Sequence, residues 1–213
     1  VSLAAGDANF RLTNSSLTLT GTGASLGGFG NTASPTINGV QLIAADTTGP
    51  ADHTITLEGS VLNLSNGPTL TNPAAQIQLT NMNVTQAGSA GVSFVNLTGP
   101  AITMSGPLLS MAGGTLTWKN SIIADAAPLT NSSTAPLVSL TNATVTTTPT
   151  GALFGPSGAI TVALAGPLLQ AVNSTLSLAG APLAMAVGST LTSTTTSPFI
   201  DLAAGTLNLG LRA

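Results

Sequence analysis

The stretch Pro167–Leu178, PLLQAVNSTLSL, is one copy of a phrase that returns along most of the chain. Further copies are PLLSMAGGTLT from Pro107, PLVSLTNATVT from Pro136 and PFIDLAAGTLN from Pro198. The four prolines are 29, 31 and 31 residues apart. Self-similarity at a nearly constant period of this length is typical of solenoids, propellers and other repeat arrays. The repeat is therefore the feature that decides the fold.

The core of the phrase is apolar-x-apolar-x-[Asn/Gly]-small-x-apolar. Seven copies fit it: FRLTNSSL from Phe10, ITLEGSVL from Ile55, IQLTNMNV from Ile77, LSMAGGTL from Leu109, VSLTNATV from Val138, LQAVNSTL from Leu169 and IDLAAGTL from Ile200. The first two copies are 45 residues apart and the next two only 22, so residues 31–43 are expected to hold a degenerate copy or an outward loop. We predict one domain, residues 1–213, with an irregular part over 1–54 and regular repeats over 55–213.

Within each copy apolar and polar residues alternate, which is the pattern of a strand with one buried face. Asn or Gly between the two alternating pieces predicts a bend, because these residues tolerate a left-handed backbone. A looser third stretch, such as AITVAL at 159–164 or LAMAV at 183–187, completes a unit of about 30 residues. One unit cannot bury its apolar face alone, but stacked units can. The sequence thus predicts an all-β fold, a parallel β-helix (solenoid) with turns of about 30 residues.

At this step the chain resembles the right-handed parallel β-helix proteins that are secreted, including passengers of the autotransporter and filamentous-haemagglutinin type. The resemblance implies a right-handed solenoid, in agreement with the strong preference for right-handed crossovers. It also implies an internal ladder of stacked side-chain amides at the bend. The residues that occupy the bend are Asn14, Asn81, Asn142 and Asn173.

The amino-acid composition of the chain excludes several classes of function. Only 4% of the residues are charged, the net charge is −3, and residues 126–200 carry no ionisable side chain. Three basic residues are too few for a nucleic-acid partner. No apolar run approaches the length of a membrane-spanning helix, and the absence of cysteine excludes disulfides and thiol chemistry.

The one cluster with acid and imidazole groups is Asp46, Asp52, His53 and Glu58. It could be a metal site or an acid/base pair, but no metal-binding spacing supports this, so we interpret it as a solvated loop. No cofactor, metal or catalytic residue is assigned. The other ionisable residues are scattered, which disfavours the carboxyl pair of a polysaccharide-active β-helix. They are Asp7, Arg11, Lys119, Asp125, Asp201 and Arg212.

Two other residue types bear on function. Trp118 is the single Trp, and we expect it to pack against a neighbouring turn or a partner rather than form a sugar platform. Runs such as 146–148 and 192–196 are similar to the threonine files of ice-binding solenoids. Those solenoids need a flat Thr-x-Thr array in register on one face, and we place the threonines of this chain at bends.

Soluble solenoids cover their two ends with polar or helical caps. Here the sequence stays strand-like to the last residue and no capping helix is visible, so we expect copies to join end to end. The expected contact residues are Val1, Leu3, Leu207, Leu209 and Leu211. The leading hypothesis is a non-enzymatic structural subunit of an extracellular filament, sheath or surface fibre, whose partners are copies of itself. The alternative is the passenger stalk of an adhesin with carbohydrate or cell-surface contacts, and the third hypothesis is a polysaccharide-active enzyme.

Overall fold

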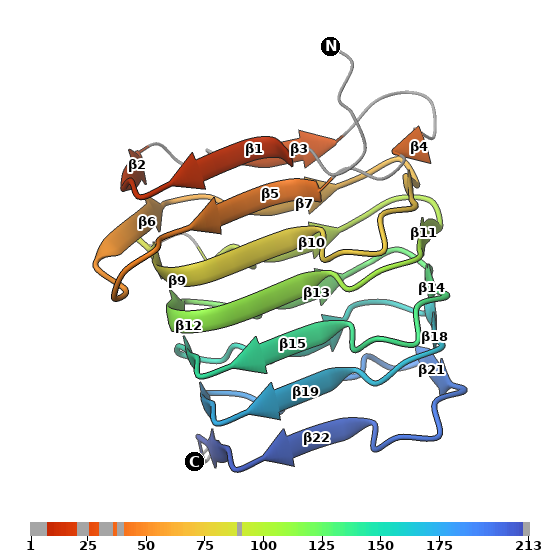
Figure 1. Cartoon of the computed structure of the whole chain (residues 1–213). Coiled ribbons are helices and arrows are strands. Elements are labelled where there is room, and N and C mark those ends of the chain that lie inside the picture. The colour runs from red at the N-terminus through yellow and green to blue at the C-terminus, as the bar shows by residue number, and fades with distance from the viewer. Residues whose placement is uncertain (1–7, 21–25, 30–35, 38–40, 89–90, 211–213) are drawn as a thin grey trace.

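The chain forms a β-solenoid of about six turns with about 31 residues in each turn. The computed structural model describes residues 8–20, 26–29, 36–37, 41–88 and 91–210. Over these residues every regular element is a strand and all strand pairs are parallel. Figure 1 shows the turns stacked from β1 at one end to β22 at the other. The predicted all-β solenoid is therefore confirmed.

Each turn contributes to three sheets, because the chain visits them in the same order on every circuit. The 12-stranded sheet holds two strand segments per turn, joined at the bend: β1 (Ala8–Thr13), β2 (Leu17–Leu19), β5 (Gln41–Asp46), β6 (His53–Leu57), β9 (Ile77–Gln86), β12 (Leu109–Trp118), β15 (Val138–Thr141), β16 (Thr144–Thr147), β19 (Leu169–Val172), β20 (Thr175–Leu178), β22 (Ile200–Ala203) and β23 (Thr206–Leu209). The 5-stranded sheet holds β3 (Gly27–Phe29), β7 (Leu62–Leu64), β10 (Val95–Leu97), β13 (Ile123–Asp125) and β17 (Phe154–Pro156). The 6-stranded sheet holds β4 (Thr36–Ile37), β8 (Thr69–Leu70), β11 (Ile102–Met104), β14 (Leu129–Asn131), β18 (Thr161–Leu164) and β21 (Thr190–Ser193).

The register corrects the predicted phasing of the N-terminal part. The position that opens each turn is occupied by Phe10, Ile43, Ile77, Leu109, Val138, Leu169 and Ile200. The second copy therefore begins at Ile43, at the end of the stretch expected to be degenerate. Ile55 instead pairs with Leu17 and Val84 in the second half of the unit. The phasing was misread because residues 47–52 form an insertion between β5 and β6 that separates the two halves of this turn.

The third stretch of the unit is regular in one place and irregular in another. AITVAL supplies β18, as the alternation predicts. LAMAV forms no strand: Leu183 makes a single bridge to Phe154, and Val187 is 99% exposed.

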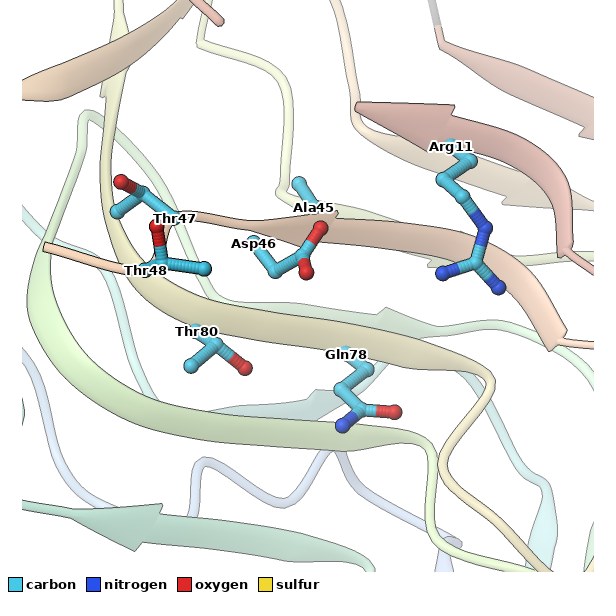
Figure 2. Close-up of a pocket in the computed structure, with 7 residues that line it drawn as sticks. All are labelled: Arg11, Ala45, Asp46, Thr47, Thr48, Gln78 and Thr80. Carbon is cyan, nitrogen blue, oxygen red and sulfur yellow. The ribbon is translucent and has the colours of Figure 1, made fainter. Parts of the chain in front are cut away.

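Alternation along each strand separates the core from the surface. In β9 the side chains of Ile77 and Leu79 are fully buried, whereas Gln78 between them is exposed. Figure 2 shows Gln78 and Thr80 on the outer side of β9, near Arg11 of β1. Because consecutive strands are in register, inward residues form columns that run along the solenoid.

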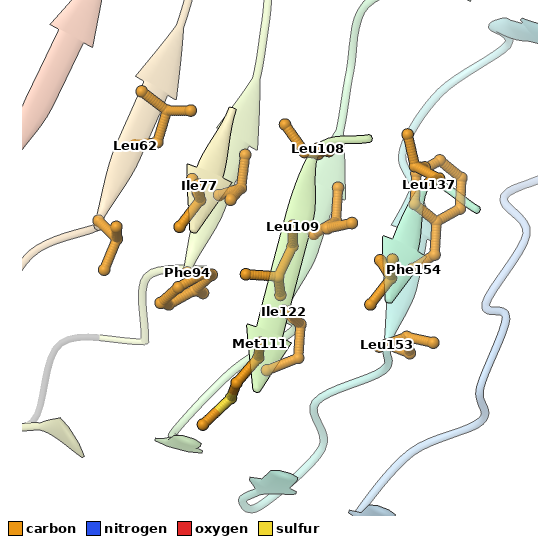
Figure 3. Packing of buried hydrophobic residues seen from close by; sticks show 14 of the residues in the cluster. Leu62, Ile77, Phe94, Leu108, Leu109, Met111, Ile122, Leu137, Leu153 and Phe154 are labelled. Atoms are coloured by element: carbon orange, nitrogen blue, oxygen red, sulfur yellow. The ribbon is translucent and has the colours of Figure 1, made fainter. Parts of the chain in front are cut away.

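The core is a continuous stack of these inward columns (Figure 3). Leu108, Leu137 and Leu168 are each 0% exposed at the same position of successive turns. Trp118 is also fully buried, and its ring meets that of Phe94 edge-on at a centroid distance of 5.2 Å. The prediction that Trp118 packs against a neighbouring turn is correct, because its Nε1–H donates to the carbonyl of Val92 at 2.8 Å. Among the described residues, no helix is long and apolar enough to span a membrane.

Candidate functional site

The bend between the two halves of the long sheet is held by residues with a left-handed backbone. The φ angles are 47° at Asn14, 51° at Asn81, 73° at Gly113, 51° at Asn142, 49° at Asn173 and 52° at Ala204. Asn and Gly adopt this conformation at lower cost than other residues, which explains their recurrence here. A Cβ on Gly113 would lie 2.2 Å from the amide oxygen of Asn81, so a larger residue here would displace that amide.

The amides at this bend contact the adjacent turn rather than each other. Asn14 Oδ1 accepts a hydrogen bond from the backbone N–H of Thr48 at 2.9 Å. Asn81 Nδ2 donates to the carbonyl of Thr47 at 3.3 Å. The side chains of the other two predicted asparagines are exposed. The turn role of these residues is therefore visible in the backbone, and the internal amide ladder stays a prediction.

The predicted acid/imidazole cluster is spread over the insertion of residues 47–52 and the segments on either side of it. His53 Nδ1 lies 2.6 Å from Asp52 Oδ1, with 27% of the His side chain and 64% of the Asp side chain exposed. Asp46 ends the strand before the insertion, and Glu58 follows the strand after it. No group of three or more His, Cys, Asp or Glu side chains that could hold a metal ion occurs among the described residues.

The outer face of the first turns carries a hollow of about 390 Å³, which Figure 2 shows. It is lined by Arg11, Ala45, Asp46, Thr47, Thr48, Gln78 and Thr80. Asp46 is the one carboxylate in this lining, and its Oδ1 accepts a hydrogen bond from the hydroxyl of Thr13 at 2.9 Å. Glycoside hydrolysis uses a pair of carboxyl groups on either side of the scissile bond. The hollow can offer hydrogen bonds to a polar ligand, but its lining lacks that pair.

Asp125 is a buried acid whose special position the sequence did not indicate. Its side chain points into the column formed by Leu97 and Pro156 and is 0% exposed. Burial raises the pKa of Asp125 from 3.8 to about 7, against the lowering effect of a hydrogen bond from the N–H of Ala127. Its Oδ2 has no partner among the described residues.

A sealed carboxyl of this kind has a structural role. Asn131 uses the same geometry, since its Oδ1 accepts the N–H of Ser133 two residues on. Both side chains therefore close a short turn at a corner of the solenoid. No substrate can reach the carboxyl of Asp125 from solvent, so it does not extend the candidate site.

The strongest concentration of accessible apolar surface lies at the two ends of the stack. Partly buried hydrophobic side chains that pack against the core occur in the first turns and in the last turns: Phe10, Leu12, Leu19, Leu26, Leu183, Leu191, Phe199, Ile200, Leu202 and Leu207. A hollow of about 400 Å³ opens at the last turn between Leu183, Leu191 and Phe199. We name the end with Phe10, Leu12 and Leu19 the first-turn surface, and the end with Ile200, Leu202 and Leu207 the last-turn surface.

Of the predicted contact residues at the ends, two can be placed. Leu207 is half-buried and Leu209 is 50% exposed, both in β23 at the last-turn surface. Val1, Leu3 and Leu211 lie outside the described residues. The additional members of the two end surfaces could not be identified before the register was known.

One outward row of the long sheet carries a charge at each of its two ends. Arg11 of β1 and Asp201 of β22 occupy the same outward row, which passes through Gln78, Ser110 and Gln170. Gln170 Nε2 donates to Asp201 Oδ2 at 3.4 Å, so outward neighbours one turn apart are within reach of each other. The row thus presents a cation at the first turn and an anion at the last.

Searches of protein-family models, curated proteins and solved structures found no match for this chain. The resemblance to secreted β-helix proteins is therefore one of architecture.

Proposed function

We propose that the chain is a non-enzymatic structural protein outside the cell that joins to copies of itself end to end and forms a filament, sheath or surface fibre. The observation that carries this proposal is the location of the incompletely buried core residues at the first-turn and last-turn surfaces. In the middle of the stack the equivalent residues are fully buried by a turn on each side. A second copy, added in register, would supply the missing neighbour.

The side chains of the two surfaces match in kind. Position by position, Phe10 would follow Ile200 and Leu12 would follow Leu202 in columns that are apolar throughout the chain. Each buried side chain of this size contributes roughly 1.5–3 kcal/mol when it is fully removed from water. Exposed strand backbone at the two ends adds the hydrogen-bonding capacity of a sheet edge.

The outward row that runs from Arg11 to Asp201 supports a head-to-tail contact between copies. When a last turn meets a first turn in register, Asp201 of one copy lies one strand spacing, about 4.8 Å, from Arg11 of the next. Opposite charges at that separation favour this pairing over first turn to first turn, which brings no carboxylate of this row to Arg11. A head-to-tail contact repeats without closing, and this generates a fibre.

The second candidate is the passenger stalk of an adhesin. The same apolar columns that could accept a second copy could equally accept further turns of the same polypeptide. In that case the solenoid is a segment of a longer rod, and its outer surface, with the hollow beside Asp46, contacts carbohydrate or the cell surface.

Assembly of the purified chain separates these candidates. Sedimentation velocity and electron microscopy at increasing concentration should reveal filaments or head-to-tail oligomers for the leading proposal. Monomeric rods at every concentration would contradict it and favour the stalk.

Charge variants then test the register. R11E and D201R should each reduce assembly, because each places two like charges at the contact. The double variant R11E/D201R restores an opposite pair between successive copies and should restore assembly. D52R is the control, since Asp52 lies on an exposed loop outside the row of Arg11 and Asp201. Failure of the double variant to recover would refute the head-to-tail register.

A further inference from the structure

The second half of each turn carries threonine at its outward positions, in register over many turns. One outward row runs through Thr54, Asn83, Thr115, Thr144, Thr175 and Thr206. The row beside it runs through Thr18, Thr56, Thr85, Thr117, Thr146, Ser177 and Asn208. We call the most regular part of these two rows the Thr face: Thr115, Thr117, Thr144, Thr146, Thr175 and Ser177. The expectation that the threonines of this chain gather at bends is therefore wrong for this sheet.

The backbone beneath the Thr face is fixed by the core. Between the outward residues of each strand lies an inward residue, and these residues, Leu116, Val145 and Leu176, are each at most 1% exposed. Threonine is also stiff at χ1 because its Cβ is branched. Adjacent turns are about 4.8 Å apart, and outward residues within one strand are separated by roughly 6.6 Å. The Thr face is therefore a two-dimensional array of hydroxyl and methyl groups with a constant repeat.

Most hydroxyls of the array are available to water. Thr117 and Thr144 are exposed and Thr146 is half-buried. Within the described part of the chain their hydroxyls have no hydrogen-bond partner, whereas the Thr115 hydroxyl donates to Asn83 Oδ1 at 2.9 Å. Residues 126–200, which supply the strands from β14 to β21, have no ionisable side chain. Water at this face therefore meets an ordered, uncharged pattern of alternating methyls and hydroxyls.

The spacing of the threonines indicates which ligand the Thr face fits. The spacing of successive turns is close to the repeat of water oxygens along the a-axis of ordinary ice, so waters bound to one threonine per turn can take up neighbouring lattice positions. Protein partners instead use aromatic or Arg anchors, which the Thr face lacks. Sugar-binding platforms use exposed aromatic rings, but Trp118 at the end of β12 is fully buried.

We propose that the Thr face binds ice. The waters that bridge its hydroxyls are held at the turn spacing and become part of the crystal surface, to which the Thr face attaches through many weak contacts. This activity is independent of end-to-end assembly, because the Thr face lies along the side of the solenoid and the first-turn and last-turn surfaces lie at its ends.

The test is growth of single ice crystals in solutions of the purified chain, measured as thermal hysteresis and as inhibition of recrystallisation. The wild-type chain should shape the crystals and slow their coarsening. T146K places a long charged side chain at the centre of the array and should abolish most of both effects. Circular dichroism of the variant checks that the strands are retained.

T130K is the matched control. Thr130 is an exposed threonine in β14, and its row on the 6-stranded sheet runs through Thr69, Thr103, Thr130, Ala163 and Thr192. Alanine interrupts this row, and the threonines paired beside it, Thr161 and Thr190, span only two turns that do not include β14. This variant should keep the wild-type effect on ice. An inactive wild-type chain would overturn the proposal, and so would equal losses in T146K and T130K. Adsorption to crystalline cellulose or chitin without any effect on ice growth would also overturn it.

Discussion

The middle turns and the end turns of this solenoid are built from the same repeat but differ in how completely they bury it. Leu140 in β15 and Leu202 in β22 belong to one inward column, with Ala171 between them. Leu140 is 0% exposed, whereas Leu202 is half-buried. The comparison teaches that a turn of this fold gains full stability from its neighbours rather than from its own sequence.

Truncation of the two leucines gives the largest expected contrast. L140A should reduce the free energy of unfolding by about 2–5 kcal/mol, because it leaves a cavity in a sealed column. L202A should cost about 1 kcal/mol or less, since part of that side chain already contacts water. Urea unfolding at a concentration where the chain is monomeric measures both losses. Equal losses would show that the end turn is as tightly packed as the middle.

A second test concerns a middle turn that is not wholly apolar. Asp125 is protonated in the folded chain up to a pKa of about 7, but ionises near 3.8 when unfolded. Its stabilising effect is fully present below pH 3.8 and is lost as the pH rises through 7, a change of up to roughly 4 kcal/mol. D125N keeps the acceptor for the Ala127 N–H and removes the ionisation.

Unfolding free energies measured between pH 4 and pH 8 check this prediction. The wild-type chain should lose stability over that range, and D125N should lose much less. D52N, at an exposed carboxyl, is the control and should follow the wild type. A D125N profile parallel to the wild type would mean that Asp125 ionises normally in the fold.

Gln76 allows a buried polar residue to be compared with a buried apolar residue at the same position of the repeat. It is 0% exposed, both polar atoms of its amide lack partners among the described residues, and Leu108 occupies the equivalent position of the next turn. Q76L should raise the free energy of unfolding by about 1–3 kcal/mol, because it removes a buried amide with unsatisfied hydrogen bonds. Q78L at the exposed neighbour should change it by about 0.5 kcal/mol at most. Thermal and urea unfolding measure the stability of the two variants. A Q76L variant less stable than the wild-type chain would contradict the buried placement of the Gln76 side chain.

The smallest expected effect is at the bend of the last turn. Ala204 has a φ of 52° where other turns have Asn or Gly. A204G should stabilise the chain by about 1 kcal/mol, because glycine adopts this conformation without the Cβ penalty. N173G should have a smaller effect, since Asn tolerates the left-handed region better than Ala. The urea midpoints of unfolding of the two variants measure this difference in stability. A lower midpoint for A204G than for the wild-type chain would contradict the prediction.

The solenoid could be predicted from the sequence, because the apolar residues that recur in the repeat are the ones that stacking buries. It misplaced the second copy at Ile55, since the insertion of residues 47–52 hides the true start at Ile43. The Thr face and the buried positions of Gln76 and Asp125 depend on register, which a single copy of the repeat does not reveal. Thr146, for example, looks like part of a polar run in the sequence TTT and becomes part of an array only beside Thr117.

The most direct test of end-to-end assembly is backbone hydrogen exchange at increasing protein concentration. Copies that join through the first-turn and last-turn surfaces should slow exchange in β1, β2, β22 and β23, while exchange in β15 and β16 stays constant because those strands are already covered on both sides. Exchange that is independent of concentration throughout the chain, or that slows in β15 and β16 instead of at the ends, would contradict the account.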